Sequence, residues 1–259
     1  MDALKADPVA WNDIVGVSSH SYNMAATTQA AAYVAGENGR NSKEYWMTEA
    51  SDNGSEEPGN SARAVSLSAR FLNDMNHRVT HWIHFLGFET DDPKDNATRI
   101  ISYSAEPFKT TVYQKYYTYQ QLADTFDVGA IFRASQSSSE GDMNWTYGLK
   151  PRVIAATAVN PDGSWGVGIA NYTADSFLGV QGWGDDKWNT EQGGHTPGQT
   201  FPVTIRIDEL KDKGDLKFEV HRSNDAAQNA KAPPVTMKNG EVTVEVAPLE
   251  LVTLRGAMQ

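Results

Sequence analysis

The sequence contains no cysteine, which excludes disulfides, thiolate metal sites and a cysteine nucleophile. No window of the 259 residues approaches the ~20 apolar residues that a membrane-spanning helix needs. Runs of Lys or Arg are also missing, and 22 basic against 33 acidic side chains give a formal net charge of −11. Because nucleic acids and anionic membranes are bound mainly through basic patches, we expect neither as a partner. Many secreted proteins need no disulfides, so the missing cysteines leave the compartment open.

Several familiar catalytic motifs are absent as well. The sequence has neither a G-x-S-x-G nucleophile elbow nor an H-E-x-x-H zinc motif. His81 and His84 are three residues apart on a predicted strand and point to opposite faces, which argues against a shared metal ion. The glycine-rich stretch 163–168 lies between predicted strands with no helix after it, unlike a phosphate-binding loop. We therefore predict no metal and no cofactor.

The first half of the chain alternates short β-rich runs with segments of helical periodicity. Hydrophobic residues make up 39% of the whole chain and charged residues 21%, which suffices for a packed core. The predicted strands lie at 14–23, 43–51 and 78–88, and the predicted helices at 24–39, 60–75 and 112–126. Strands and helices that alternate at this spacing predict βαβ units with parallel strands.

After about residue 126 the pattern changes to β-branched, partly alternating runs separated by turn residues. The Asn-Pro-Asp-Gly stretch at 160–163 and the Asn-Gly pair at 239–240 are tight-turn signals. The predicted strands lie at 152–159, 164–172, 201–208, 216–223, 241–247 and 249–256. This half predicts an antiparallel β-sandwich. We divide the chain into an α/β part at 1–127 and a sandwich at 128–259.

Candidate site residues follow from the rule that ligands and catalytic groups gather at the C-terminal ends of parallel strands. The rule selects His20 and Tyr22 after the first run, Glu49 after the second, and Trp82 with His84 in the third. Side chains alternate along a strand, so His20 shares a face with Tyr22, and Trp82 with His84. A carboxylate, imidazoles, a phenol and an indole together are typical of a sugar site, where an aromatic ring receives the apolar face of a pyranose.

These stretches resemble the active-site strands of the large clan of retaining glycoside hydrolases with (β/α)8 barrels. The stretch YWMTEAS (45–51) resembles the nucleophile strand of that clan, SSHSYN (18–23) its strand six and HWIHF (81–85) its strand eight. The passages 115–135 and 249–256 resemble glycoside hydrolase family 30. The resemblance implies an α/β plus all-β fold, with strands six to eight of a (β/α)8 barrel followed by the family's side β-sandwich.

The resemblance also implies a role for each candidate residue. Glu49 would be the catalytic nucleophile and would form a glycosyl-enzyme intermediate. Tyr22 would orient Glu49, His20 and His84 would bind the sugar, and Trp82 would form the floor of its subsite. The implied activity is hydrolysis of β-glycosidic bonds in a poly- or oligosaccharide by double displacement, so the expected partner is a carbohydrate.

One element of that chemistry is missing from the sequence. Retaining hydrolysis needs a second carboxyl group ~5–5.5 Å from the first, as general acid and base. In the clan this group is the Glu of an Asn-Glu pair on barrel strand four, and the present sequence contains no Asn-Glu pair. A complete barrel takes ~250 residues, about twice the length of the α/β part. We therefore expect the chain to be the C-terminal portion of a longer enzyme.

Two other interpretations stay open. The chain could be a non-catalytic carbohydrate-binding or structural module whose functional unit is the sandwich, or an intact small protein with an unrelated activity. The Trp-rich, acidic segment 182–195 could bind a ligand, although we favour a plain surface loop. A secreted location is favoured by the family resemblance alone, and the sequence determines neither the sugar nor the oligomeric state.

Overall fold

A parallel three-stranded sheet forms the first half of the protein. The computed structural model describes residues 2–21, 26–37, 40–52, 54–138, 153–174 and 197–256. The sheet has the order β1-β2-β3, with both neighbouring pairs parallel. Its strands are β1 (Gly16–Ser21), β2 (Glu44–Ala50) and β3 (His81–His84), connected by α3 (Thr28–Val34) and α4 (Ser61–Asn76) and preceded by α1 (Asp2–Ala6) and α2 (Pro8–Asp13). The predicted alternation of strands and helices is confirmed.

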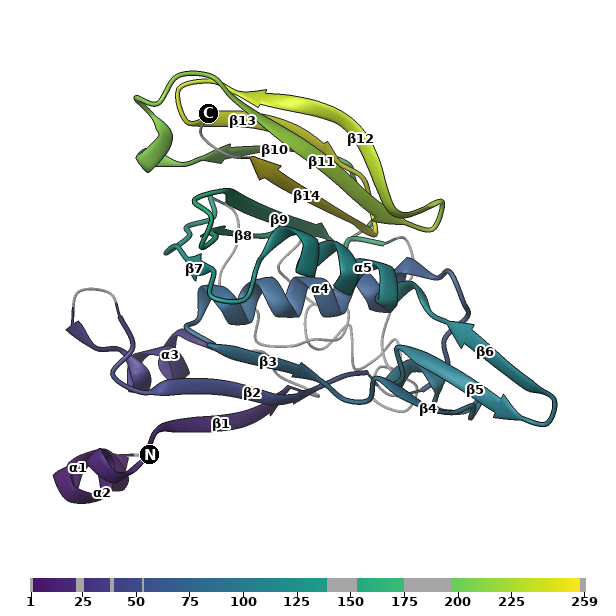
Figure 1. Ribbon diagram of the computed structural model, residues 1–259, viewed down its shortest axis with the longest axis horizontal. Coiled ribbons are helices and arrows are strands. Elements are labelled where there is room, and N and C mark those ends of the chain that lie inside the picture. The colour runs from purple at the N-terminus through teal and green to yellow at the C-terminus, as the bar shows by residue number, and fades with distance from the viewer. Residues whose placement is uncertain are drawn as a thin grey trace.

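The long helix α4 matches the predicted helix at 60–75 and begins after an N-cap at Asn60. The side-chain oxygen of Asn60 accepts a hydrogen bond from the backbone N–H of Ala62 at 2.8 Å. Most of its residues are buried, because the helix lies between two sheets (Figure 1). Met75 packs against the core of the three-stranded sheet, whereas Val65 and Leu72 pack against the antiparallel sheet on the other side. The helix is therefore shared between both halves of the protein.

A small sheet follows β3, in a stretch for which the sequence analysis gives no strand beyond residue 88. It consists of β4 (Phe88–Thr90), β5 (Ile101–Ala105) and β6 (Phe108–Val112), with a short 3-10 helix η2 (Asn96–Thr98) between β4 and β5. The predicted helix at 112–126 is present as α5 (Gln114–Thr125) and starts later than expected. The difference arises because the β-branched run before it pairs with β5 as an antiparallel hairpin.

The second half is antiparallel, as predicted. A six-stranded sheet has the order β12-β11-β14-β9-β8-β7, and a separate pair is formed by β10 and β13. The strands are β7 (Ile131–Phe132), β8 (Val153–Val159), β9 (Trp165–Asn171), β10 (Phe201–Arg206), β11 (Leu216–Asn224), β12 (Ala227–Met237), β13 (Glu241–Val246) and β14 (Glu250–Gly256), with η3 (Asp208–Leu210) after β10. The Asn-Gly pair at 239–240 forms the turn between β12 and β13, with positive φ angles of 49° and 76°.

Strand β12 was not predicted from the sequence. It contains Pro233 and Pro234, which cannot donate ladder hydrogen bonds, and it lies at the edge of the sheet, where prolines are tolerated. The pairing with β11 shifts by one residue at these prolines, between Phe218 opposite Val235 and Val220 opposite Ala232. A bulge at the edge therefore accommodates both rings.

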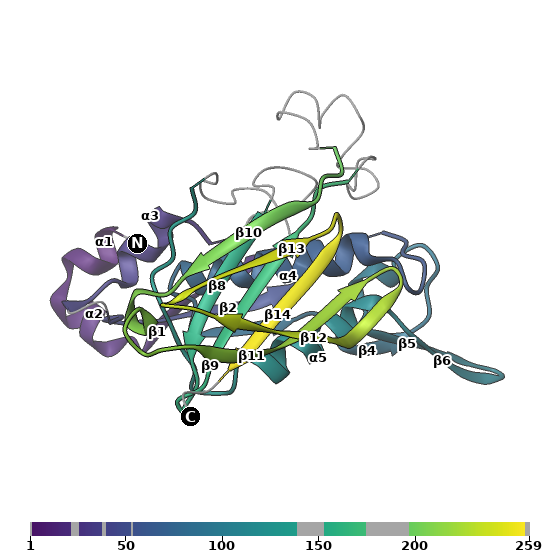
Figure 2. The same ribbon diagram turned by 90° about the horizontal axis from the view of Figure 1, so that it is seen from above.

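The six-stranded sheet is covered on both faces, as Figures 1 and 2 show. One face shares a core with β10 and β13, centred on Val167, Phe218 and Val244. The other face packs against α4 and α5 through Leu72 and Leu122. Every residue of the central strand β9 is accordingly buried. Since α4 and α5 share a core with β8 and β9, the division at residue 127 stays a prediction.

Candidate active site

Glu49 and His20 come together at the C-terminal ends of two neighbouring parallel strands. They are opposite each other in the pairing of β2 with β1, and the His20 Nδ1 atom lies 3.5 Å from a carboxylate oxygen of Glu49. The His20 side chain is 52% exposed and that of Glu49 33%. Both groups are therefore anchored by strands and still accessible, on the side of the sheet opposite α4, which we call the open face. A carboxylate in this position can reach a ligand.

A β-bulge turns Glu49 to the open face. Tyr45 and Met47 point toward the helices and are buried, so strict alternation would bury Glu49 beside them. The pairing instead shifts by one residue between Ser19 opposite Met47 and His20 opposite Glu49, which makes Thr48 an extra residue on β2. Bulges next to active sites commonly redirect a side chain in this way. Glu49 consequently faces outward while the next residue, Ala50, is fully buried.

Trp82 and His84 lie on the opposite side of the sheet from Glu49. The Trp82 indole N–H donates a 2.9 Å hydrogen bond to Asp74 of α4, and its ring contacts Phe71 edge-on. Both Trp82 and His84 also contact the ring of Tyr119 on α5. The two side chains share a face, and in this structure they attach α4 and α5 to the sheet. Their contact with a sugar stays a prediction.

His84 is held as a neutral imidazole. Its Nε2 atom lies 2.9 Å from the backbone carbonyl oxygen of Thr98, and its Nδ1 atom lies 2.9 Å from the Tyr119 hydroxyl. The carbonyl can only accept, so Nε2 carries the proton and Nδ1 accepts from the hydroxyl. Burial lowers the pKa of His84 to about 3. The residue therefore behaves as a fixed connector rather than as a proton carrier.

The open face carries exposed hydrophobic side chains that the sequence analysis did not select. Exposure alternates along the third strand, so Ile83 and Phe85 are exposed where Trp82 and His84 are not. Phe85 follows β3 directly and is 39% exposed, on the side of the sheet that carries Glu49. The alternation of side chains along a strand separates Trp82 and His84 from Ile83 and Phe85. It does not show which of these two pairs faces the helices, so the sequence alone could not select Phe85.

A buried arginine side chain contacts the C-terminal ends of β1 and β2 from the side of α4. Arg70 of α4 is fully buried and donates hydrogen bonds to the backbone carbonyls of Ser21 at 2.6 Å and Ser51 at 3.1 Å. Its second terminal nitrogen is 2.9 Å from Asp52, whose side chain is 2% exposed. Ser21 follows His20 in the chain, and Ser51 is two residues after Glu49. The sequence contained no signal for this contact.

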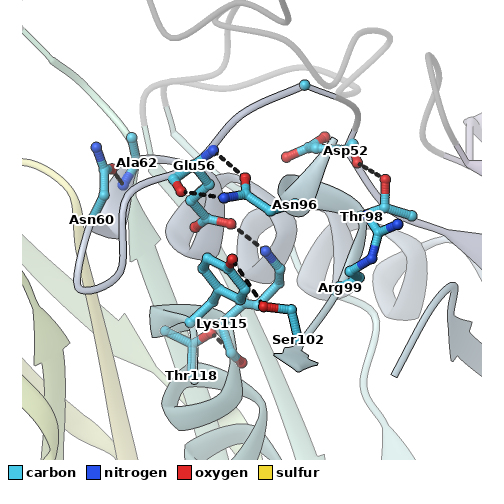
Figure 3. Close-up of polar contacts among 12 residues, drawn as sticks. Asp52, Glu56, Asn60, Ala62, Asn96, Thr98, Arg99, Ser102, Lys115 and Thr118 are labelled. Atoms are coloured by element: carbon cyan, nitrogen blue, oxygen red, sulfur yellow. Dashed lines mark hydrogen bonds and ion pairs between the residues drawn. The ribbon is translucent and has the colours of Figure 1, made fainter. Parts of the chain in front are cut away.

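A second buried network joins the segment between β2 and α4 to η2 and to α5 (Figure 3). The Glu56 backbone N–H donates to the Asn96 side chain, and the Asn96 amide donates back to the Glu56 carbonyl at 2.9 Å. The Glu56 carboxylate forms a buried ion pair with Lys115 of α5. Burial raises the pKa of Glu56 and lowers that of Lys115, and their mutual attraction opposes both shifts. Thr98 in turn donates to the Asp52 carbonyl at 3.2 Å.

Two predicted features fall outside the described residues, namely Tyr22 and the segment 182–195. Within the described ranges, no three His, Asp or Glu side chains converge in a way that could hold a metal ion. None of the helices in those ranges is long and apolar enough to cross a bilayer.

Comparison with solved structures identifies the fold. A family 30 subfamily 8 xylanase from Clostridium acetobutylicum superposes with a TM-score of 0.58 and 12% identity, over 99% of this chain and 52% of the xylanase. An α-L-arabinofuranosidase from Thermotoga maritima gives a TM-score of 0.55 and 13% identity, over 93% of this chain and 52% of that protein. The fold is most like that of glycoside hydrolase family 30. The xylanase C catalytic domain from Talaromyces cellulolyticus, also of family 30, gives a TM-score of 0.57 at 13% identity, over 99% of this chain and 48% of that domain.

The chain spans about half the length of these family 30 structures. No protein-family model matches the sequence, and no curated protein sequence does. Identities of 12–13% establish a common fold and leave the chemistry to be argued from the residues of this chain. The resemblance to family 30 inferred from the short motifs is thus confirmed at the level of the fold.

Proposed function

We propose that this chain supplies the nucleophile half of a retaining glycosidase, with Glu49 as the nucleophile. The observation that carries the proposal is the accessible Glu49–His20 pair at the C-terminal ends of two parallel strands. This is the end of a parallel sheet at which catalytic groups are found in α/β enzymes. The fold likeness to family 30 enzymes supports an assignment of β1, β2 and β3 to barrel strands six, seven and eight.

The proposed reaction is a double displacement. An oxygen of the ionised Glu49 carboxylate attacks the anomeric carbon, the bond to the leaving oxygen breaks, and a glycosyl ester forms on Glu49. Water then attacks the same carbon, releases the sugar and restores the carboxylate. A second carboxyl group protonates the leaving oxygen and afterwards takes the proton from water. We propose that this group comes from residues outside the 259, because the chain spans about half of the related structures.

For the substrate we propose a β-linked poly- or oligosaccharide. We propose that His20, 3.5 Å from Glu49, contacts a hydroxyl group of the sugar that Glu49 attacks, and that Tyr22 orients Glu49. The geometry favours Phe85 as an aromatic contact for the sugar, because its side chain is exposed on the open face. A polymeric glycan does not cross membranes, so we also propose a secreted enzyme.

The proposal is tested by trapping the intermediate on the full-length protein that contains this segment. An activated 2-deoxy-2-fluoro glycoside should add one glycosyl group to Glu49, detected by intact mass and located by peptide sequencing. Glu49→Gln should abolish labelling and lower kcat by more than about 1,000-fold. Glu44→Gln is the matched control, since Glu44 lies at the other end of the same strand, and it should be labelled normally.

Chemical rescue provides an independent readout. Glu49→Ala with added azide should regain turnover and release a glycosyl azide of inverted configuration, because azide attacks in place of the missing carboxylate. Absence of an adduct with xylosyl, glucosyl and arabinofuranosyl reagents, together with glycan binding by the protein, would instead support a carbohydrate-binding module.

A further inference from the structure

Arg70 joins the two strands that carry the candidate active-site pair. One of its terminal nitrogens donates to the Ser21 carbonyl, which ends β1, and to the Ser51 carbonyl, which directly follows β2. The other nitrogen pairs with Asp52, and both charged side chains are almost completely buried. All of these partners lie within three residues of His20 or Glu49 in the sequence.

The site needs such a connection because the strand pairing is interrupted there. The bulge at Thr48 breaks the regular register of β1 with β2 just before the pairs His20–Glu49 and Ser21–Ala50. A bulge leaves one residue unpaired and disrupts the ladder locally, so it holds the neighbouring residues less firmly than a continuous ladder would. The guanidinium adds a contact to each strand just past the bulge, on the side of the sheet away from the open face.

Arginine is suited to this position. Its guanidinium is planar, stays charged and presents several N–H donors in a fixed geometry, so a single side chain can hold two carbonyls and one carboxylate at once. Lysine would keep the charge, but its single nitrogen could not reproduce that geometry. Asp52 balances the charge, which a buried cation requires.

We propose that Arg70 is a positioning residue that sets the separation of His20 and Glu49 by holding the carbonyls that end β1 and β2. This inference rests on the function proposed above. The contacts of Arg70 within the described part of the chain are to Ser21, Ser51 and Asp52, so we propose that it acts on His20 and Glu49 through the backbone. Small displacements of a nucleophile reduce reactivity strongly, and about 1 Å can cost roughly 100-fold in rate.

The test compares variants of the full-length protein. Arg70→Lys should lower the rate of Glu49 labelling at saturating 2-fluoro glycoside by at least tenfold, with little change in the concentration for half-maximal rate. In a crystal structure of Arg70→Lys, the distance between His20 Nδ1 and Glu49 should differ from 3.5 Å by more than 0.5 Å, roughly the tolerance of a productive site. The distance needs no catalysis, so it reports on Arg70 even if wild-type protein is never labelled and the proposed function fails.

The matched control is Lys115→Met. The Lys115–Glu56 pair is equally buried, and Lys115 has no described contact with β1 or β2. This variant should lose thermal stability and keep its labelling rate within twofold. If Arg70→Lys does not fold, the double replacements Arg70→Met with Asp52→Leu and Lys115→Met with Glu56→Leu make the same comparison without an unpaired charge. The inference would be overturned if the Arg70 variant kept the wild-type His20–Glu49 distance and labelling rate. It would also be overturned if the Arg70 and Lys115 variants lost labelling rate equally.

Discussion

Ala50 is fully buried whereas Glu49, its neighbour in the chain, faces the open side, and the bulge at Thr48 determines which of the two faces outward. Deleting Thr48 would leave a regular strand in which Glu49 follows Met47 and still points outward. We expect this deletion to keep Glu49 labelling by a 2-fluoro glycoside within about tenfold of wild type. Inserting alanine before Thr48 adds a second extra residue, and we expect more than about 100-fold loss. If the deletion and the insertion reduced Glu49 labelling equally, the assignment of Thr48 as the bulge residue would be contradicted.

Protonation of His84 should destabilise the fold in acid. Its pKa in the folded protein is about 3, against 6.5 for an unperturbed histidine, so the unfolded chain binds more protons between these values. Stability is therefore fully present above pH 6.5 and is lost as the pH falls toward 3, by at most roughly 5 kcal/mol. His84→Gln should flatten this part of a plot of unfolding free energy against pH. His81→Gln, on the exposed face of the same strand, is the matched control for the loss of a histidine side chain.

Asp74 should show the opposite dependence. Burial raises the pKa of its carboxyl group to about 6, although the Ala26 N–H and the Trp82 indole both donate to it. The folded state then binds more protons than the unfolded state between pH 3.8 and 6, so this group's contribution to stability falls by roughly 3 kcal/mol across that range as the pH rises. The Trp82 indole proton resonance should titrate with a midpoint near pH 6. A resonance that does not move between pH 4 and 8 would refute this assignment.

Close packing of α5 on β9 should make Gly166 intolerant of a side chain. A Cβ atom there would lie 2.5 Å from the Thr125 carbonyl oxygen and 3.0 Å from the Phe126 ring. We expect Gly166→Ala to lower the free energy of unfolding by about 1–3 kcal/mol in chemical denaturation. Gly87→Ala is the control, because a Cβ atom at Gly87 would meet nothing within 4 Å. Its stability should stay within about 0.5 kcal/mol of wild type.

Local sequence patterns were enough to predict most helices and strands. The helical periodicity of 60–75 and the Asn-Gly turn signal at 239–240 both act over a few residues, and each segment has the structure that its pattern predicts. Strand β12 escaped prediction because Pro233 and Pro234 argue against a strand unless it is known to lie at an edge. Edge position is a property of the assembled sheet.

In the candidate site, too, some features could be predicted from the sequence and others depend on the tertiary structure. The sequence by itself determined that a carboxylate, Glu49, ends one predicted strand and that His20 lies near the end of the strand before it, because residue type and order along the chain are local properties. Only the tertiary structure decided which side chains face outward. Alternation defines two faces, but the bulge at Thr48 and the packing of α4 and α5 determine that Glu49 is open and Trp82 is covered. Arg70 reaches Ser21 across 49 residues of sequence, and no local pattern encodes a contact formed only when the helix packs on the sheet.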